Sequence, residues 1–292
     1  MSRGKEHLPV DLHLHSTASD GSLTPTQLIA RAAELGLAGV ALTDHDTLEG
    51  IDEALAAGRS HGLEVLPGVE LSASDGENKI HLLGYDPLFP EKISAVLEER
   101  RRERYRRMEK MLLRLRSLGF HIGSEEVAAE AGGAAPGRLH LARVMVRRGF
   151  VPTVEKAFSL YLAQGRPAYV PRNGLDPAKA IALLHRAGAV PVVAHPGASG
   201  RKFIRQLVAL GLRGIEVYHP DHNPEMVRYY RLLAQKLGLL VTGGSDYHGD
   251  RDYRAGSLGS ITVPYICLVA IKKTPRGASI YSPQTGQNEM WE

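Results

Sequence analysis

A stretch near the start of the chain, VDLHLHSTASDGS, contains two histidines one residue apart and an aspartate five residues after the second. These residues are His13, His15 and Asp20. Residues i and i+2 of a strand point the same way, so both histidines can face one site if VDLHLH is a strand. Imidazole and carboxylate groups suit zinc, manganese or iron. A metal site needs three or four protein ligands, so other segments must supply the rest.

Groups of the same two types end other apolar segments of the chain, such as TDHDT, PGVELS and GSDYH. The strand-end candidates are, in chain order, His13, His15, Asp20, Asp44, His45, Asp46, Glu70, His81, His195, Asp246 and His248. A lone histidine at a strand end is more often a satisfied polar group than a ligand, but so many such groups together are difficult to explain in that way. We expect two or three metal ions here, with Glu70 as a bridge, holding a hydroxide nucleophile near neutral pH.

The elements that must position these groups follow a repeating pattern. Short apolar, often β-branched runs alternate with helical stretches of ten or more residues, as in LAGVALTDHD followed by TLEGIDEALAAGRSHG. Thr24–Pro25 and Asn223–Pro224 are typical helix starts. At least six such units favour a βα barrel over an open sheet, and the strand ends of such a barrel face one common mouth.

Residues 90 to about 167 break the pattern, because they show helical spacing and no strand signal. We therefore predict a discontinuous barrel over 8–97 and 168–271, with an all-helical insertion or cap over 98–167. The arginine run at 100–107 is expected to be a solvated face, paired with nearby glutamates at helical spacing. The segment 272–292 is polar and rich in Pro, Gly and Ser, and we expect it to be disordered.

Composition excludes several classes of protein. The chain has 292 residues, 43% of them hydrophobic and 23% charged, and it can bury a stable core without disulfide bonds or structural metal ions. Its single cysteine, Cys267, excludes an internal disulfide. The first ten residues lack the apolar core of a signal peptide, and no apolar run approaches a membrane span, so we expect a cytoplasmic protein. The formal net charge of +4 favours anionic substrates, and nothing indicates an obligate protein partner.

The segments DLHLHSTASDGSLTP, TDHDT, PGVELS, HLLGY, AHPG, GIEVYHPDH and GSDYHG resemble motifs of the PHP (polymerase and histidinol phosphatase) family. More closely, the chain resembles the branch of nucleoside 3′,5′-bisphosphate phosphatases and 5′→3′ exoribonucleases. The resemblance extends from residue 10 to about 270. It implies an α/β fold, a distorted (β/α)₇ barrel, with a trinuclear metal site that commonly holds manganese; Zn²⁺, Fe²⁺ and Mg²⁺ are alternatives.

The same resemblance assigns the ligands to three ions. It implies that the first ion is held by His13, His15, Glu70 and Asp246, the second by Glu70, His81 and His195, and the third by Asp20, His45 and His248. Asp44 and Asp46 are expected either to orient these ligands or, for Asp46, to cap the following helix.

Catalytic and substrate-binding roles are expected outside the ligand set as well. We assign catalysis to His219, Asp246 and His195, with His219 protonating the leaving group or contacting substrate. The candidate substrate-binding residues are Arg138, His140, Arg143, Arg172 and His222, of which the arginines suit phosphate.

The expected activity is therefore metal-dependent hydrolysis of nucleotide phosphate esters. The substrate would be a small nucleotide, such as a nucleoside 3′,5′-bisphosphate, or short single-stranded RNA cut from its 5′ end. Two alternatives are a histidinol-phosphate-type phosphatase and an amidohydrolase-like C–N hydrolase. The latter chemistry usually bridges its metals with a lysine, whereas Glu70 is the bridging candidate here. A metal-bound RNA-binding module without catalysis is disfavoured by the filled ligand set.

Overall fold

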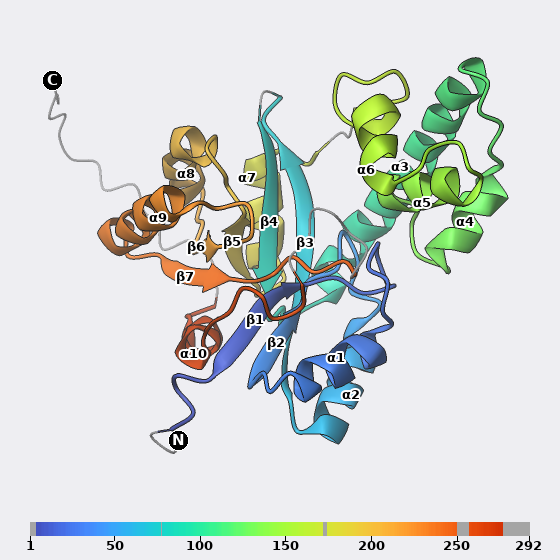
Figure 1. The fold of residues 1–292 in the computed structure, drawn as a ribbon. Helices are drawn as coiled ribbons and strands as arrows, with labels where there is room; N and C mark the ends of the chain where they lie inside the picture. Colours follow the sequence, from blue (N-terminus) through green and yellow to red (C-terminus); the bar gives the residue numbers. More distant parts are fainter. Residues whose placement is uncertain (1–3, 77, 172–173, 250–256, 277–292) are drawn as a thin grey trace, which may run out of the picture.

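The computed structural model describes residues 4–76, 78–171, 174–249 and 257–276. A single sheet lies at the centre, with helices around it (Figure 1). The strands are β1 (Pro9–Leu14), β2 (Gly39–Leu42), β3 (Glu64–Ser74), β4 (Lys79–Tyr85), β5 (Val190–Ala194), β6 (Gly214–Tyr218), β7 (Leu240–Gly243) and β8 (Val263–Pro264). The helices are α1 (Pro25–Glu34), α2 (Ile51–His61), α3 (Glu91–Ser117), α4 (Ser124–Ala131), α5 (Arg138–Arg147), α6 (Val154–Ala157), the π-helical turn η1 (Phe158–Leu162), α7 (Pro177–Arg186), α8 (Gly200–Ala209), α9 (Pro224–Leu237) and α10 (Tyr265–Lys273).

The order of strands in the sheet is β7-β6-β5-β4-β3-β2-β1-β8. Strands β1, β2 and β3 are parallel to one another, and so are β5, β6 and β7. Strand β4 joins the two parallel blocks and runs antiparallel to both of its neighbours. The two-residue β8 pairs antiparallel with the start of β1. The predicted βα alternation therefore holds within each block, and a β3–β4 hairpin connects them.

The sheet nearly closes on itself where the segment after β7 returns to β1. The backbone N–H of His15 donates to the carbonyl of Tyr247 at 3.0 Å. Gly244 lies so close to β1 that a Cβ atom there would sit 2.4 Å from the backbone nitrogen of His13. This contact admits only glycine without a backbone shift. The predicted distorted barrel is thus confirmed, with β8 as an extra short strand.

Helices α1 and α9 begin where the sequence predicts. The Thr24 hydroxyl accepts a hydrogen bond from the backbone N–H of Gln27, and the Asn223 side chain accepts one from that of Met226. Each cap satisfies an N–H group that has no partner within its helix, and proline at the first helical position needs none. Both helices pack an apolar face on the sheet, with Leu28 and Leu233 among the buried residues.

Helices α3 to α6 and η1 follow β4 and gather to one side of the sheet (Figure 1). Helix α3 belongs to two cores, since Ile93 and Leu97 pack with the barrel, whereas Met108 and Met111 pack with the other helices. The predicted boundary at residue 98 falls inside α3, between these two groups. Residues 98–167 are all described and contain no strand. The division into domains remains a prediction.

The end of the described chain is more ordered than the sequence predicts. Lys272 and Lys273 lie in α10, and Arg276 Nη2 lies 2.8 Å from Oδ2 of Asp86. The expectation of a disordered tail from residue 272 is therefore wrong for residues 272–276, because these contacts hold them against the barrel. The remainder of that segment lies outside the described residues. Within the described part of the chain, the helices are too short or too polar to cross a lipid bilayer.

Candidate metal centre

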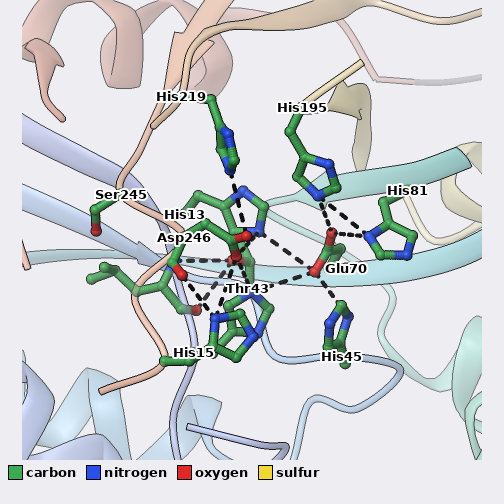
Figure 2. Close-up of polar contacts among 12 residues, drawn as sticks. His13, His15, Thr43, His45, Glu70, His81, His195, His219, Ser245 and Asp246 are labelled. Carbon is green, nitrogen blue, oxygen red and sulfur yellow. Dashed lines mark hydrogen bonds and ion pairs between the residues drawn. The ribbon is translucent and has the colours of Figure 1, made fainter. Parts of the chain in front are cut away.

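Side chains from β1, β4 and the segments that follow β2, β5 and β7 meet around Glu70 (Figure 2). The expectation that Glu70 ends its strand is wrong, because β3 continues past it to Ser74 in the hairpin with β4. Glu70 is fully buried, and its Oε2 lies 2.8 Å from Nδ1 of His45. The other oxygen, Oε1, lies 2.8 Å from Nδ1 of His81 and 3.1 Å from Nε2 of His195. Glu70 therefore occupies the central position that was expected of a bridging carboxylate.

Asp246, which follows β7, completes the centre on the β1 side. Its Oδ1 lies 3.0 Å from Nε2 of His15 and 3.3 Å from Nε2 of His13. Three groups of residues each offer ligand atoms that lie within 4.8 Å of one another inside the group, namely His13–His15–Glu70–Asp246, His15–Asp20–His45–His248 and His45–Glu70–His81. Because the groups share members, they form one continuous cluster.

These groups can be compared with the ligand sets expected from the sequence. The first expected set coincides with one observed group. The third, Asp20 with His45 and His248, appears with His15 added. In the second, the observed group contains His45 in place of His195, although His195 Nε2 lies only 3.3 Å from His81 Nδ1. The structure brings all nine candidates together, and which residue binds which ion remains a prediction.

Several of these residues have unusual backbone conformations. Among the described residues, those other than glycine with positive φ are Asp46, Asp86, His195 and Asp246, at 53°, 53°, 25° and 51°. A left-handed backbone is unfavourable for residues with a Cβ atom and persists where the surroundings enforce it. His195 directly follows β5, whereas Asp246 and Asp46 lie in the segments after β7 and β2. Local strain therefore accompanies the positioning of two candidate ligands, His195 and Asp246, and of Asp46 beside His45.

The donor set fits metal ions. Within the described residues, buried side-chain atoms without a hydrogen-bond partner include His13 Nε2, both ring nitrogens of His15, Asp20 Oδ1, His45 Nδ1, Glu70 Oε2 and Asp246 Oδ1. Buried polar atoms are normally satisfied, and an exception needs an explanation such as an ion. Here the unsatisfied atoms are imidazole nitrogens and carboxylate oxygens that face one another, which is the arrangement that divalent cations require.

The electrostatics of the cluster differ from one candidate ligand to the next. Burial tends to lower the pKa values of His13 and His195, but the surrounding carboxylates raise the pKa of His13 well above its usual range and that of His195 to about 9, so a metal ion must displace a proton from each ring.

Other members of the cluster are already in the protonation state that binds a metal ion. Burial tends to raise the pKa of Glu70, but the imidazoles of His45 and His81 hold that pKa well below its usual range. Glu70 is therefore a carboxylate. Burial lowers the pKa of His15 to about 3 and that of His81 to about 4. These two imidazoles are therefore neutral, which is the form that coordinates a metal ion.

Glu216 on β6 is a residue that the sequence analysis missed. It is fully buried, and its Oε1 lies 2.9 Å from Nδ1 of His13. Its Oε2 accepts a hydrogen bond from the backbone N–H of His195 at 2.7 Å. A carboxylate that binds the second nitrogen of a metal-ligating histidine fixes the orientation of the ring. The available signal was a charged residue in the middle of the apolar strand GIEVY.

The two aspartates beside His45 have different partners. Asp44 accepts hydrogen bonds from Ser16 and Ser19 and so holds the loop between His15 and Asp20. Helix α2 begins at Ile51 with Gly50 as its N-cap, so the capping role considered for Asp46 is wrong. Asp46 instead pairs with Arg104 of α3, with Nε and Oδ2 3.3 Å apart.

A cavity of about 270 Å³ opens onto the cluster. Beyond the ligands, its wall contains Lys79 of β4 and, from the helical segment and the residues after it, Arg107, Arg138, Phe158 and Tyr169. The guanidinium of Arg138 lies 5.5 Å from the Phe158 ring centroid and 5.8 Å from that of Tyr169. The cavity thus combines cations and aromatic rings opposite the candidate metal ligands. Of these wall residues, the sequence analysis named only Arg138 as a substrate-binding candidate, and it placed Arg107 in the solvated arginine run.

His219 also lines this cavity. Its Nδ1 accepts a hydrogen bond from the backbone N–H of Asp221 at 3.1 Å. In the neutral ring the proton must then be on Nε2, which lies 3.4 Å from Oδ2 of Asp246. His219 therefore directs an N–H group toward the cluster, as a proton donor to a leaving group must.

Three further substrate-binding candidates, His140, Arg143 and His222, are absent from the wall of this cavity. His140 is buried, and its Nδ1 accepts the backbone N–H of Gly137 at the start of α5. His222 accepts the N–H of Gly197 through Nε2 and binds the Val217 carbonyl through Nδ1. Both rings therefore hold backbone segments together. Arg172 lies outside the described residues.

The arginine run of α3 differs in part from its predicted solvated face. The expected pairs form, with Arg102 Nε 3.3 Å from Oε1 of Glu98. Arg100 and Arg104, however, are only 8% and 7% exposed. The expectation of solvent exposure is wrong for these two residues, because Arg104 binds Asp46 of the barrel and Arg100 pairs with Glu103 in a buried position.

Comparison with known proteins adds independent findings. A family model described as PHP domain matches residues 11–130. The chain is 37% identical over 263 residues to a 3′,5′-nucleoside bisphosphate phosphatase of Chromobacterium violaceum, with 83% of this chain and 90% of that protein aligned. It is 36% identical over 246 residues to a 5′-3′ exoribonuclease of Haemophilus influenzae, with coverage of 82% and 89%. A predicted metal-dependent phosphoesterase from Bifidobacterium adolescentis superposes with a TM-score of 0.84 at 34% identity, covering 93% of this chain and 97% of that one.

Proposed function

Because the chain belongs to the PHP domain family of phosphoesterases, we propose that it hydrolyses phosphate esters of nucleotides. The substrates would be nucleoside 3′,5′-bisphosphates, which lose the 3′-phosphate, and short single-stranded RNA, which is shortened from its 5′ end. Support comes from the relatives named for these two activities. The observation that carries the proposal is a cluster of imidazoles and carboxylates around Glu70 that faces a wall of cationic and aromatic side chains.

Three ions, of manganese, would be held by the nine candidate ligands, with Glu70 between the first and second. The number is supported by the three overlapping groups of ligand atoms. Bound divalent ions would supply an activated water nucleophile at neutral pH and would neutralise charge on the phosphate.

The chain's own residues would bind and orient the nucleotide. Lys79, Arg107 and Arg138 line the cavity and would bind a phosphate group that is not being cleaved. Phe158 and Tyr169 offer ring faces on which a nucleobase can stack. His219 would deliver the proton of Nε2 to the departing alkoxide.

The C–N hydrolase alternative would require a lysine among the candidate metal ligands, and the lysine of this cavity does not occupy such a position. Lys79 is the lysine that lines the cavity, and its Nζ lies 2.6 Å from Oε1 of Gln164 and 2.7 Å from the Tyr169 hydroxyl. It therefore points to the cavity wall, whereas Glu70 occupies the centre of the ligand cluster.

The test is a comparison of substrates with metal-reconstituted protein. Adenosine 3′,5′-bisphosphate and a 5′-phosphorylated oligoribonucleotide should be hydrolysed, with phosphate released from the first and mononucleotides from the second. Histidinol phosphate and an N-acyl amide serve as the competing substrates. Faster turnover of either competitor would overturn the proposal. So would a failure to hydrolyse either nucleotide with Mn²⁺, Zn²⁺, Fe²⁺ or Mg²⁺ supplied.

A further inference from the structure

A second cavity adjoins the one that contains the metal cluster, on the side where α3 begins. Its volume is about 420 Å³, which is within the range of cavities that bind small organic molecules. His45 and Arg104 line both cavities, so the two hollows meet at these side chains. A molecule bound at the cluster can therefore extend in two directions.

The walls of the second cavity suit a group with flat apolar faces and polar edges. Apolar surface comes from Leu48, Pro90 and Leu97. The hydroxyl groups of Ser19 and Ser94 donate to Asp44 and to the Pro90 carbonyl, so they offer a ligand acceptor oxygens. A nucleoside has this character, because a base offers two apolar faces and a hydrogen-bonding rim, and its ribose carries hydroxyl groups.

The charges of the two cavities differ in a way that orients such a molecule. In the second cavity, the carboxylates of Asp46, Glu49 and Glu98 face the guanidinium groups of Arg101 and Arg104. Two of these form direct pairs, with Glu49 Oε1 2.5 Å from Arg101 Nη1. These acidic side chains disfavour a further phosphate there. The cations of the first cavity favour one instead.

Arg104 lies at the junction of the two cavities. It is 7% exposed, and its Nη2 has no hydrogen-bond partner among the described residues. The guanidinium group donates to Asp46 through Nε, so this hydrogen bond does not involve Nη2. A buried guanidinium with an unsatisfied donor indicates the place where an anionic group of the ligand binds.

We propose that the second cavity binds the nucleoside on the far side of the scissile phosphate, with Arg104 contacting that phosphate. This inference rests on the proposed function and locates the binding site of one part of an RNA substrate, the nucleoside that keeps the scissile phosphate on its 5′-oxygen after cleavage. Water adds to phosphorus, the bond from phosphorus to the 3′-oxygen breaks, and that oxygen takes a proton. Adenosine 3′,5′-bisphosphate (pAp) then yields AMP and phosphate, and 5′-phosphorylated diadenylate (pApA) yields two AMP. The same bond breaks in both, but only pApA places a nucleoside in the second cavity.

The experiment fills the second cavity and compares these two substrates. Ser94 lines it from α3, and Ser94→Phe places a ring in the space of the nucleoside. We expect kcat/KM for pApA to fall at least about tenfold more than kcat/KM for pAp. Ala135→Leu fills the cavity from another segment and should give the same selectivity. Ala95→Phe, at the neighbouring exposed position of α3, is the matched control and should leave kcat/KM for both substrates unchanged.

Each outcome decides the proposal. Turnover of pAp by the variants shows that they are folded and loaded with metal, so a selective loss on pApA supports the second cavity as the nucleoside site. An equal loss on both substrates, or no loss on either, overturns it while leaving the proposed function intact. If the wild-type protein hydrolyses neither substrate, the proposed function itself fails and this inference falls with it.

Discussion

The Nδ1 atom of His13 lies 2.9 Å from Oε1 of Glu216, and both side chains are fully buried. Because Nδ1 donates to this carboxylate, Nε2 is the ring nitrogen that faces Asp246 and Glu70, and it can bind a metal ion once the ion displaces its proton. Glu216 belongs to β6 and His13 to β1, and only β7 lies between these two strands where the sheet closes on itself. One buried hydrogen bond thus sets the orientation of a candidate ligand from a strand that is 203 residues further along the chain.

Glu216→Gln is expected to weaken metal binding by about 10- to 100-fold. The amide can still accept from His13, but its NH₂ group cannot accept the backbone N–H of His195 that Oε2 accepts in the wild-type protein. The measurement is metal affinity in competition with a chromophoric chelator. Activity should return at high Mn²⁺, which a folding defect would not show. Glu225→Gln, at an exposed glutamate, is the control, and equal affinities for both variants would contradict the role of Glu216.

Asp246→Ala and His195→Ala should each lower phosphate release by more than about a hundredfold, because each removes a candidate ligand at the centre of the cluster. The metal content per chain should fall with the activity. Circular dichroism should remain that of the wild type, since neither residue packs in an apolar core. Normal turnover of Asp246→Ala with Mn²⁺ supplied would refute its assignment.

The sequence allowed the ligand cluster to be predicted because strand ends are local features. The spacing of His13 and His15 identifies them as candidate ligands, and the position of Glu70 and Asp246 after apolar runs identifies those two. Convergence of these ends follows from the barrel, which the βα alternation indicates. The antiparallel β4 was visible only as a segment that follows β3 after a turn, since strand direction depends on the whole sheet.

The walls of the cavities could not be predicted in the same way. Arg104 and Arg107 lie in a run of arginines in which helical spacing gives each a similar character. Burial of Arg104 depends on how α3 packs over the loop that contains Asp46, more than fifty residues earlier in the chain. His140 and His222 look similar to site histidines in sequence, but local backbone N–H groups occupy their ring nitrogens. Tertiary packing decides these cases.

Hydrolysis of RNA should depend on salt more steeply than hydrolysis of pAp. An oligoribonucleotide offers additional phosphates to Lys79, Arg107 and Arg138, and each neutralised phosphate of a single strand adds about 0.7 to the slope of log affinity against log salt. Arg138→Gln removes one such contact and should therefore reduce the slope for RNA by about 0.7. The measurement is KM from about 50 to 200 mM salt. Equal slopes for both substrates would show that these cations do not contact the longer chain.

Stability at acid pH should depend on Glu64, at the start of β3. Burial tends to raise its pKa, but hydrogen bonds from Tyr265 and Lys272 lower the pKa below the ordinary value. A lowered carboxylate pKa stabilises the fold above the unfolded-state pKa, and this contribution is lost as the pH falls through the folded-state pKa. Glu64→Gln should therefore cost up to about 1 kcal/mol at neutral pH, and less as Glu64 in the wild type becomes protonated.

Urea midpoints of wild type and Glu64→Gln at pH 7 and near pH 4 test this dependence. The gap between the two proteins should narrow at the lower pH. Glu34→Gln changes an exposed glutamate at the end of α1 and should shift neither midpoint. A gap that widens on acidification would show that Glu64 is stabilised in its protonated form, opposite to the direction argued here.

The loss of kcat on replacement of His219 should be larger for a substrate whose leaving group needs a proton. The N–H of Nε2 is directed at the cluster, and the backbone of Asp221 holds the ring in that tautomer. The 3′-oxygen of pAp leaves as a poor alkoxide and benefits from protonation, whereas p-nitrophenolate leaves without it. His219→Gln should therefore lower kcat on pAp by about 10²-fold or more and leave kcat on p-nitrophenyl phosphate nearly unchanged. A similar loss on both substrates would mean that His219 orients Asp246 and donates no proton, and unchanged kcat on both would remove His219 from the mechanism.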